Sequence, residues 1–145
     1  MTAPDPALLA YLAALPEAAP ILERIRGKLG PRRPSVTLSP RIVGPDGSHR
    51  IHVTLGRPTL DGPIREAWID VDHREGSVLR GCMHALARTI SLGLQAGVPV
   101  GTFVRALRGT DGGPGGAVED CEGVTEASSV PDLVGRILER EARGG

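Results

Sequence analysis

The sequence predicts an α+β domain in which a small antiparallel sheet packs on a central long helix, with shorter helices towards both ends. Alternation of apolar and polar residues over 51–55 and again over 67–71 is typical of half-buried strands. Residues 41–43 can add a third strand, so we expect two to three strands. Apolar residues between Glu75 and Gly97 recur at helical spacings, and they are Leu79, Met83, Leu86, Ile90 and Leu94.

The long helix has a second set of apolar or small residues, which are Val78, Cys82, Ala85 and Leu92. A helix that is apolar on two sides is usually covered on two sides, so we expect it to lie centrally and Cys82 to be buried. Ser77 is the expected N-cap, Gly97 is placed to end the helix in a left-handed conformation, and Pro99 to open the next helix.

Residues 1–30 are expected to form an N-terminal helical segment, and residues 31–145 the α+β domain. Asp5 and Pro6 start a first helix, and a second begins at Pro20 and ends at Gly30. We expect both helices to pack on the main body through their leucine stripes; an arm that reaches a partner is the alternative.

The glycine-rich stretch 109–116 is interpreted as a simple linker, because it lacks the lysine and the spacing of a phosphate-binding loop. A last helix follows, capped by Ser128 or Ser129, with Asp132 at a capping-box position. Its expected buried stripe is Val130, Leu133, Val134, Ile137 and Leu138.

Composition excludes several classes of protein. Basic and acidic residues both number 17, so bulk charge indicates neither a nucleic-acid nor a membrane partner. One Trp, one Tyr and one Phe disfavour an extended stacking platform for single strands. Two distant cysteines do not form a disulfide framework, and we expect reduced thiols and a cytoplasmic protein.

Charge is nevertheless uneven along the chain, because basic residues are concentrated between Arg24 and Arg57. A solvated face is the favoured interpretation. The alternative is a surface that binds nucleotides or nucleic acids through phosphate. Its candidate phosphate-binding residues are Arg32, Arg33, Arg41, Arg50 and Arg57.

Neither a metal site nor a catalytic site is predicted, and no cofactor is expected. The histidines and cysteines lack the paired spacings of a zinc site. Asp70, Asp72, His73 and Glu75 cluster after the second strand, where they could bind a cation or transfer protons. We favour a polar junction between strand and helix, because no partner nucleophile is evident.

Several motifs together carry a resemblance to a known family. They are Asp61-Gly62, Glu75-Gly76, the run Ile90-Ser91-Leu92-Gly93-Leu94-Gln95, Gly97-Val98-Pro99 and Ser128-Ser129-Val130-Pro131-Asp132, with Arg32-Arg33-Pro34 upstream. In order and spacing they resemble the TSCPD domain family and the C-terminal region of adenosylcobalamin-dependent (class II) ribonucleotide reductases. The resemblance covers about residues 32–140.

Departures from the family pattern shape the expected function. Val130 replaces the cysteine of the name-giving Thr-Ser-Cys-Pro-Asp motif, and Asp111 lies near the place of a further family cysteine. The reductases carry radical chemistry on a large barrel, for which this chain has no room. The resemblance therefore implies a non-catalytic, free-standing binding or accessory module. Expected partners are a second copy of the chain or a ribonucleotide reductase served in trans.

Overall fold

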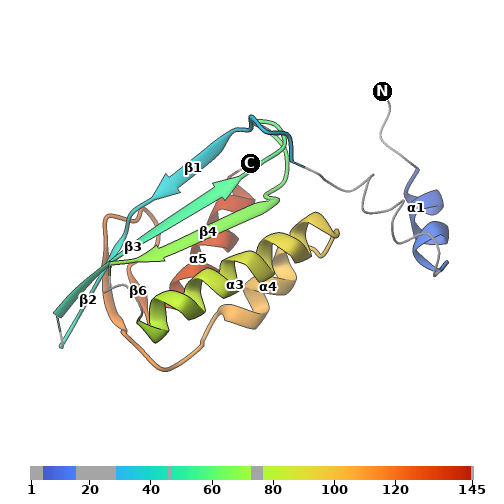
Figure 1. Ribbon diagram of the computed structural model, residues 1–145. Helices are drawn as coiled ribbons and strands as arrows, with labels where there is room; N and C mark the ends of the chain where they lie inside the picture. Colours follow the sequence, from blue (N-terminus) through green and yellow to red (C-terminus); the bar gives the residue numbers. More distant parts are fainter. Residues whose placement is uncertain (1–4, 16–28, 46, 73–76, 145) are drawn as a thin grey trace.

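The computed structural model describes residues 5–15, 29–45, 47–72 and 77–144. Six strands form one antiparallel sheet in this part of the chain, and helices α3, α4 and α5 lie together against it (Figure 1). The strands are β1 (Ser35–Leu38), β2 (Arg41–Gly44), β3 (Gly47–Gly56), β4 (Glu66–Val71), β5 (Gly116–Glu119) and β6 (Glu126–Ala127). The helices are α1 (Pro6–Ala13), α3 (Val78–Gln95), α4 (Val100–Leu107) and α5 (Val130–Arg143).

Strand β3 organises the sheet, because it is long enough to pair with three others. Its first residues, 47–50, pair with β2, while 51–56 pair with β4 and 53–56 with β1. The sheet then continues from β2 through β5 to β6. Burial alternates along β3 and β4, so one face of these strands packs in the core and the other is open to solvent.

The predicted α+β class is confirmed, but the sheet is larger than the two to three strands expected. β1 lies inside a segment that prolines punctuate. β5 and β6 are too short for alternation to reveal them, since they span only four and two residues. β5 pairs with β2, which is distant in sequence, and β6 pairs with β5.

Helix α3 begins and ends as predicted. The Ser77 side chain accepts a hydrogen bond from the backbone N–H of Arg80 at 3.2 Å. Gly97 has a φ of 93°, and the N–H of Val98 bonds back to the carbonyl of Gly93. The buried face carries Met83, Ala87, Ile90 and Leu94.

The prediction that the second apolar face of α3 is also covered is wrong. Val78 is 82% exposed and Leu92 69%, and Cys82 and Ala85 are exposed as well. The reason is position: α3 packs along β4 at the rim of the sheet, so only one side of the helix reaches the core.

The free edge of β4 is closed by a side chain from α3. The Ser91 hydroxyl accepts a hydrogen bond from the N–H of Ala67 at 2.9 Å. It also lies 3.0 Å from the carbonyl oxygen of Ala67 and 2.9 Å from that of Ala87. The predicted bond from Ser91 back to a helix carbonyl is therefore present, and the same hydroxyl satisfies an edge strand.

Replacing Ser91 with alanine is expected to lower the free energy of unfolding by about 1–2 kcal/mol, because the buried N–H of Ala67 loses its acceptor. Urea unfolding followed by circular dichroism measures the loss. The matched control is Thr89→Ala, since the Thr89 hydroxyl bonds only to the Ala85 carbonyl on an exposed turn of the same helix. It should change stability by no more than about 0.5 kcal/mol. Equal effects of the two substitutions would contradict the edge-closing role.

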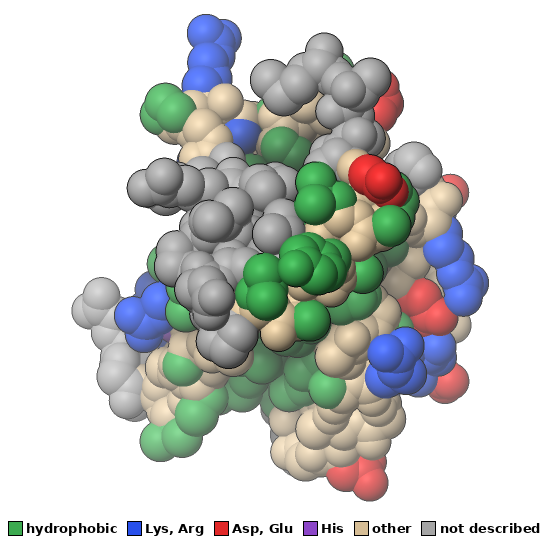
Figure 2. Space-filling model, turned by 90° about the vertical axis from the view of Figure 1, so that its right-hand side faces the viewer, with side chains coloured by type: hydrophobic (Ala, Val, Ile, Leu, Met, Phe, Trp, Pro, Cys, Tyr) green, Lys and Arg blue, Asp and Glu red, His purple; other side chains and the backbone are tan. Residues whose placement is uncertain are grey.

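The first N-terminal helix forms as predicted, with the Asp5 carboxylate capping the N–H of Ala7 at 2.9 Å. It does not pack as expected: Leu8 is 52% exposed, Tyr11 is 66% exposed, and α1 lies apart from the sheet (Figure 1). On the side of the molecule where α1 lies, hydrophobic side chains gather at the surface (Figure 2). The second expected helix falls largely on residues 16–28, outside the described residues. Among the described residues, no helix combines the length and apolar character needed to cross a bilayer.

Candidate functional site

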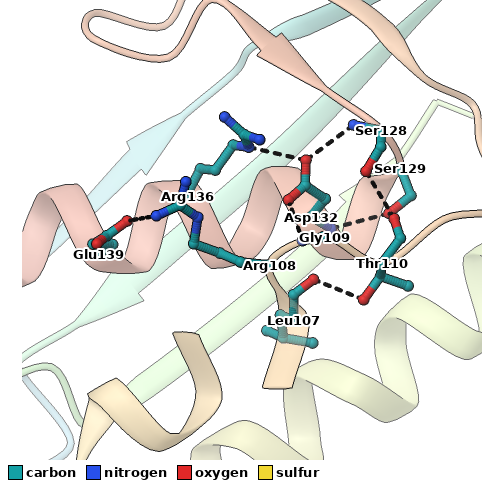
Figure 3. A network of polar contacts seen from close by, with 9 residues as sticks. All are labelled: Leu107, Arg108, Gly109, Thr110, Ser128, Ser129, Asp132, Arg136 and Glu139. Carbon is teal, nitrogen blue, oxygen red and sulfur yellow. Dashed lines mark hydrogen bonds and ion pairs between the residues drawn. The ribbon is translucent and has the colours of Figure 1, made fainter. Parts of the chain in front are cut away.

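A polar network joins the start of α5 to the end of α4 (Figure 3). Ser129 is the N-cap of α5, and its hydroxyl accepts from the N–H of Asp132 at 3.1 Å. The same hydroxyl donates to the carbonyl of Thr110 at 2.6 Å, and the Ser128 hydroxyl donates to that carbonyl at 2.9 Å. The predicted cap is confirmed, and it connects two segments that are distant in sequence.

Asp132 is the centre of this network, and its residue is fully buried. One carboxylate oxygen accepts from the N–H of Gly109 at 2.8 Å. The other accepts from the N–H of Ser128 and from Nε of Arg136, both at 2.9 Å. Each carboxylate oxygen thus accepts at least one hydrogen bond, and the three donor groups belong to Gly109, Ser128 and Arg136.

The pKa of Asp132 follows from these contacts. Burial alone would raise it, because a carboxylate loses its hydration in the protein interior. The bonds from Gly109 and Ser128, together with the bond and positive charge of Arg136, outweigh burial, and the pKa lies below its ordinary value. The group is therefore an ionised carboxylate already saturated by donors, which suits a structural latch rather than proton transfer.

The stretch 109–116 is held in place and is not the simple linker expected. The N–H of Gly113 bonds to the carbonyl of Ser128 at 3.3 Å, and Gly116 is already the first residue of β5. A side chain at Gly115 or Gly116 would meet backbone atoms of Ser128 or Val43. The glycines are needed for close approach between backbones, which composition alone does not distinguish from flexibility.

The five arginines of the predicted phosphate-binding group do not converge on one site. Arg33 binds Glu66 through two hydrogen bonds, of 2.7 and 2.6 Å. Arg50 donates to the carbonyl of Ser39 at 2.6 Å and pairs with Asp120. Arg57 donates to the carbonyls of Gly62 and Glu141, which ties the β3–β4 connection to α5.

Arg32 and Arg41 differ from the other three in the group. Neither side chain has a hydrogen bond or ion pair with the described residues. Arg32 lines a pocket together with Arg33, while Arg41 lies on β2, opposite Arg50 and Glu119. Phosphate binding by this group stays a prediction, and Arg32 and Arg33 are the two of its members that line one pocket in the described part of the chain.

The acidic cluster after β4 is only partly described, because His73 and Glu75 lie outside the described residues. Asp70 contacts Nε of Arg80 at 3.1 Å and Nε2 of His84 at 3.2 Å. Partial burial would raise the pKa of Asp70, but the His84 hydrogen bond and the Arg80 charge outweigh it, and the pKa is lowered. The carboxylate thus holds two side chains of α3, whereas Asp72 is exposed.

The two cysteines occupy different environments, and that of Cys82 differs from the expectation. Cys82 is exposed on the solvent side of α3, which corrects the expectation of a buried residue. Cys121 is partly covered; burial raises its pKa more than the nearby Arg140 lowers it. Among the residues described, no three His, Cys, Asp or Glu side chains are grouped so that they could hold a metal ion.

The sequence did not predict the stacking of Trp68 on His84. Trp68 alternates with buried residues on β4, so its outward position was predictable, but its neighbours were not. Its ring stacks on that of His84 at a centroid distance of 5.3 Å, and it is 51% exposed. His84 belongs to α3 rather than to the sheet, so only the packing of α3 along β4 brings the rings together.

Comparisons with known proteins give a consistent result. The TSCPD domain family matches residues 23–142. The chain is similar to the vitamin B12-dependent ribonucleotide reductase of Agrobacterium fabrum, with 37% identity over 117 residues, and to that of Bradyrhizobium diazoefficiens, with 35% identity over 118 residues. Each match covers 81% of this chain but only 9% of the relative. A further such reductase, from Streptantibioticus cattleyicolor, is 32% identical over 114 residues, which is 79% of this chain and 18% of the relative. No solved structure matches significantly.

The fold and the network together define a small α+β domain whose last helix is fastened by a Ser-Ser-Val-Pro-Asp segment. The chain belongs to the TSCPD domain family. Val130, which the resemblance sets against the name-giving cysteine, is fully buried and serves here as a core residue. Asp111, which the resemblance sets near a further cysteine, is exposed. The chain spans about a tenth of the length of the relatives from Agrobacterium fabrum and Bradyrhizobium diazoefficiens.

Proposed function

We propose that this domain is a non-catalytic accessory or assembly module, and that it docks on a ribonucleotide reductase through the outer face of α3. The observation that carries the proposal is the exposed apolar side of that helix. Val78, Ala85 and Leu92 follow one another at intervals of seven residues. Cys82, Thr89 and Ala96 do the same one row away, and all six are exposed.

Two such rows form the seam that a helix presents to a helical partner. Small side chains in one row allow the backbones to approach closely, and the valine and leucine of the other can fill a facing groove. Both rows are free of charge along the whole of α3. Apolar surface in a row of this length usually marks a contact with another protein.

The identity of the partner rests on the family. The similar proteins are vitamin B12-dependent ribonucleotide reductases, in which the matching segment is a small part of a much longer chain. A domain that carries this segment is suited to bind the remainder of such a protein. The non-catalytic role is supported by the Asp132 network, whose carboxylate is saturated by structural hydrogen bonds.

The double variant Val78→Glu/Leu92→Glu is expected to weaken binding to a vitamin B12-dependent ribonucleotide reductase at least about 100-fold, since each buried aliphatic side chain contributes about 1.5–3 kcal/mol. Sedimentation of the mixed proteins measures the dissociation constant. The matched control is Leu60→Glu, because Leu60 is a large hydrophobic residue that is 81% exposed outside α3. It should leave binding unchanged.

Two results would overturn the proposal. Turnover of ribonucleotides by the chain alone, with cobalamin cofactor and reductant, would contradict a non-catalytic role. Self-association that the double variant abolishes, with no binding to the reductase, would assign the α3 face to a second copy of the chain instead.

A further inference from the structure

The open face of the sheet carries a pocket of about 490 Å³ beside the only tryptophan of the chain. Its described lining residues are Pro31, Arg32, Arg33, Ser35, Thr54, Glu66 and Trp68. They come from β1, β3, β4 and the segment before β1. This volume lies within the range of pockets that hold small molecules, roughly 300–1,000 Å³.

Trp68 is held so that part of its ring stays available. His84 stacks against it at 5.3 Å with an angle of 30° between the rings, and Asp70 in turn binds Nε2 of His84 at 3.2 Å. One face of the indole is thus supported from α3. Since Trp68 is nevertheless 51% exposed and lines the pocket, the remaining surface of the indole faces the pocket.

The polar residues around the ring divide into fixed and available groups. Arg33 is committed to Glu66 through two short hydrogen bonds, and its Nη1 also donates to the carbonyl of Gly30 at 3.2 Å. Arg32 is exposed, and no described residue neutralises it. A cation that no described residue neutralises therefore lies next to the indole of Trp68. Ser35 and Thr54 line the same pocket, and the Thr54 hydroxyl lies 2.8 Å from that of Thr37.

We propose that this pocket binds a nucleotide, with the base stacked on Trp68 and the phosphate bound by Arg32. Aromatic stacking accepts any base, because every base has a π face. An unpaired guanidinium binds phosphate through charge-assisted hydrogen bonds. The proposal is independent of the docking role, because Trp68 and Arg32 lie outside the exposed rows of α3.

A second pocket, of about 650 Å³ beside α5, carries more arginines but suits an anion less well. Each of its guanidinium groups already has an acidic partner. Arg108 and Arg143 bind Glu139, Arg136 binds Asp132, and Arg140 binds Glu122. Arg108 and Arg143 share one carboxylate, but every guanidinium group of this pocket has an acidic partner, whereas no described residue neutralises Arg32.

The chain provides its own probe for the test. Because Trp68 is the only tryptophan, its fluorescence reports this pocket alone. Adenosine monophosphate is expected to quench it saturably, with a dissociation constant on the order of 1 mM. Ribose phosphate, which lacks the base, should not quench. Absence of saturable quenching by adenosine monophosphate would overturn the proposal.

Variants assign the contacts. Arg32→Gln is expected to weaken binding about tenfold through loss of a charged hydrogen bond. The matched control is Arg41→Gln, which removes the other arginine of the group that has no partner among the described residues. Arg41 does not line the pocket, so this variant should change nothing. Trp68→Leu, followed by equilibrium dialysis with labelled nucleotide, should weaken binding roughly 5- to 150-fold. Equal effects of the two arginine variants would contradict the assignment, since only nonspecific charge would then be involved.

A further arm separates the two sources of such a ligand. A short single-stranded oligonucleotide that binds more tightly than adenosine monophosphate assigns the pocket to one nucleotide of a strand. Equal affinity assigns it to free nucleotides. Both results support the stacking and phosphate contacts, provided that Arg32→Gln weakens the binding of both ligands.

Discussion

Asp132→Ala is expected to lower the free energy of unfolding by about 2–4 kcal/mol, because it leaves the N–H groups of Gly109 and Ser128 without acceptors and Arg136 without its partner. The value is below that of a fully buried ion pair because the Arg136 side chain is 28% exposed and keeps access to water. Urea unfolding measures the change. Asp111→Ala is the matched control: Asp111 is an exposed aspartate of the adjoining loop, and its replacement should cost no more than about 0.5 kcal/mol.

At acid pH, the wild type and Asp132→Ala should have the same free energy of unfolding. The pKa of Asp132 is lowered in the folded protein. Its stabilising contribution is therefore complete above the pKa of an unfolded aspartate, about 3.9. The contribution is lost as pH falls through the lower, folded value. The gap in unfolding free energy should be full at pH 7 and narrow below about pH 4. A gap that stays constant into acid would show that the charge of Asp132 is not what stabilises the network.

Gly116→Ala is expected to cost about 2–5 kcal/mol, from backbone strain together with overpacking. Gly116 has a φ of 154°, which residues with a side chain rarely adopt. An added methyl group would also meet the carbonyl oxygen of Val43, and it would lie 2.8 Å from the carbonyl carbon. Because Val43 and Gly116 belong to paired strands, relief requires β2 and β5 to separate. Thermal unfolding and amide exchange in β5 measure the effect.

The matched control is Gly112→Ala in the same loop. Gly112 also has a positive φ, of 126°, but an added methyl group would have no atom within 4 Å. Its replacement should cost only the backbone strain, about 1–2 kcal/mol. If both alanines cost the same, the close approach between β2 and β5 would contribute nothing, and the original interpretation of 109–116 as a linker would be favoured.

Local patterns in the sequence predicted much of the fold. Alternation located β3 and β4, periodicity located α3, and capping residues placed the ends of α3 and the start of α5. The stripe of α5 was also correct, since all five of its residues are fully buried. These predictions are correct because each pattern depends on neighbours within a few residues along the chain.

What the sequence could not show depends on tertiary position. Both sides of α3 are apolar, but only packing at the rim of the sheet decides that Leu92 faces solvent. The capping position of Asp132 was visible, whereas its bond to Gly109 joins residues more than twenty positions apart. Likewise, Arg32 and Arg41 look alike in sequence, and only the fold places one of them beside Trp68.

The rim of the sheet limits the ways in which copies of this domain can associate. Ser91 occupies the hydrogen-bonding groups of β4 at Ala67, β1 spans only four residues before Pro40, and β6 only two. None of these strands offers a long ladder to an incoming chain, which is the usual route to fibres and strand-swapped aggregates. Association through backbone pairing of edge strands is therefore disfavoured. Contacts with other proteins then depend on side chains of the helices.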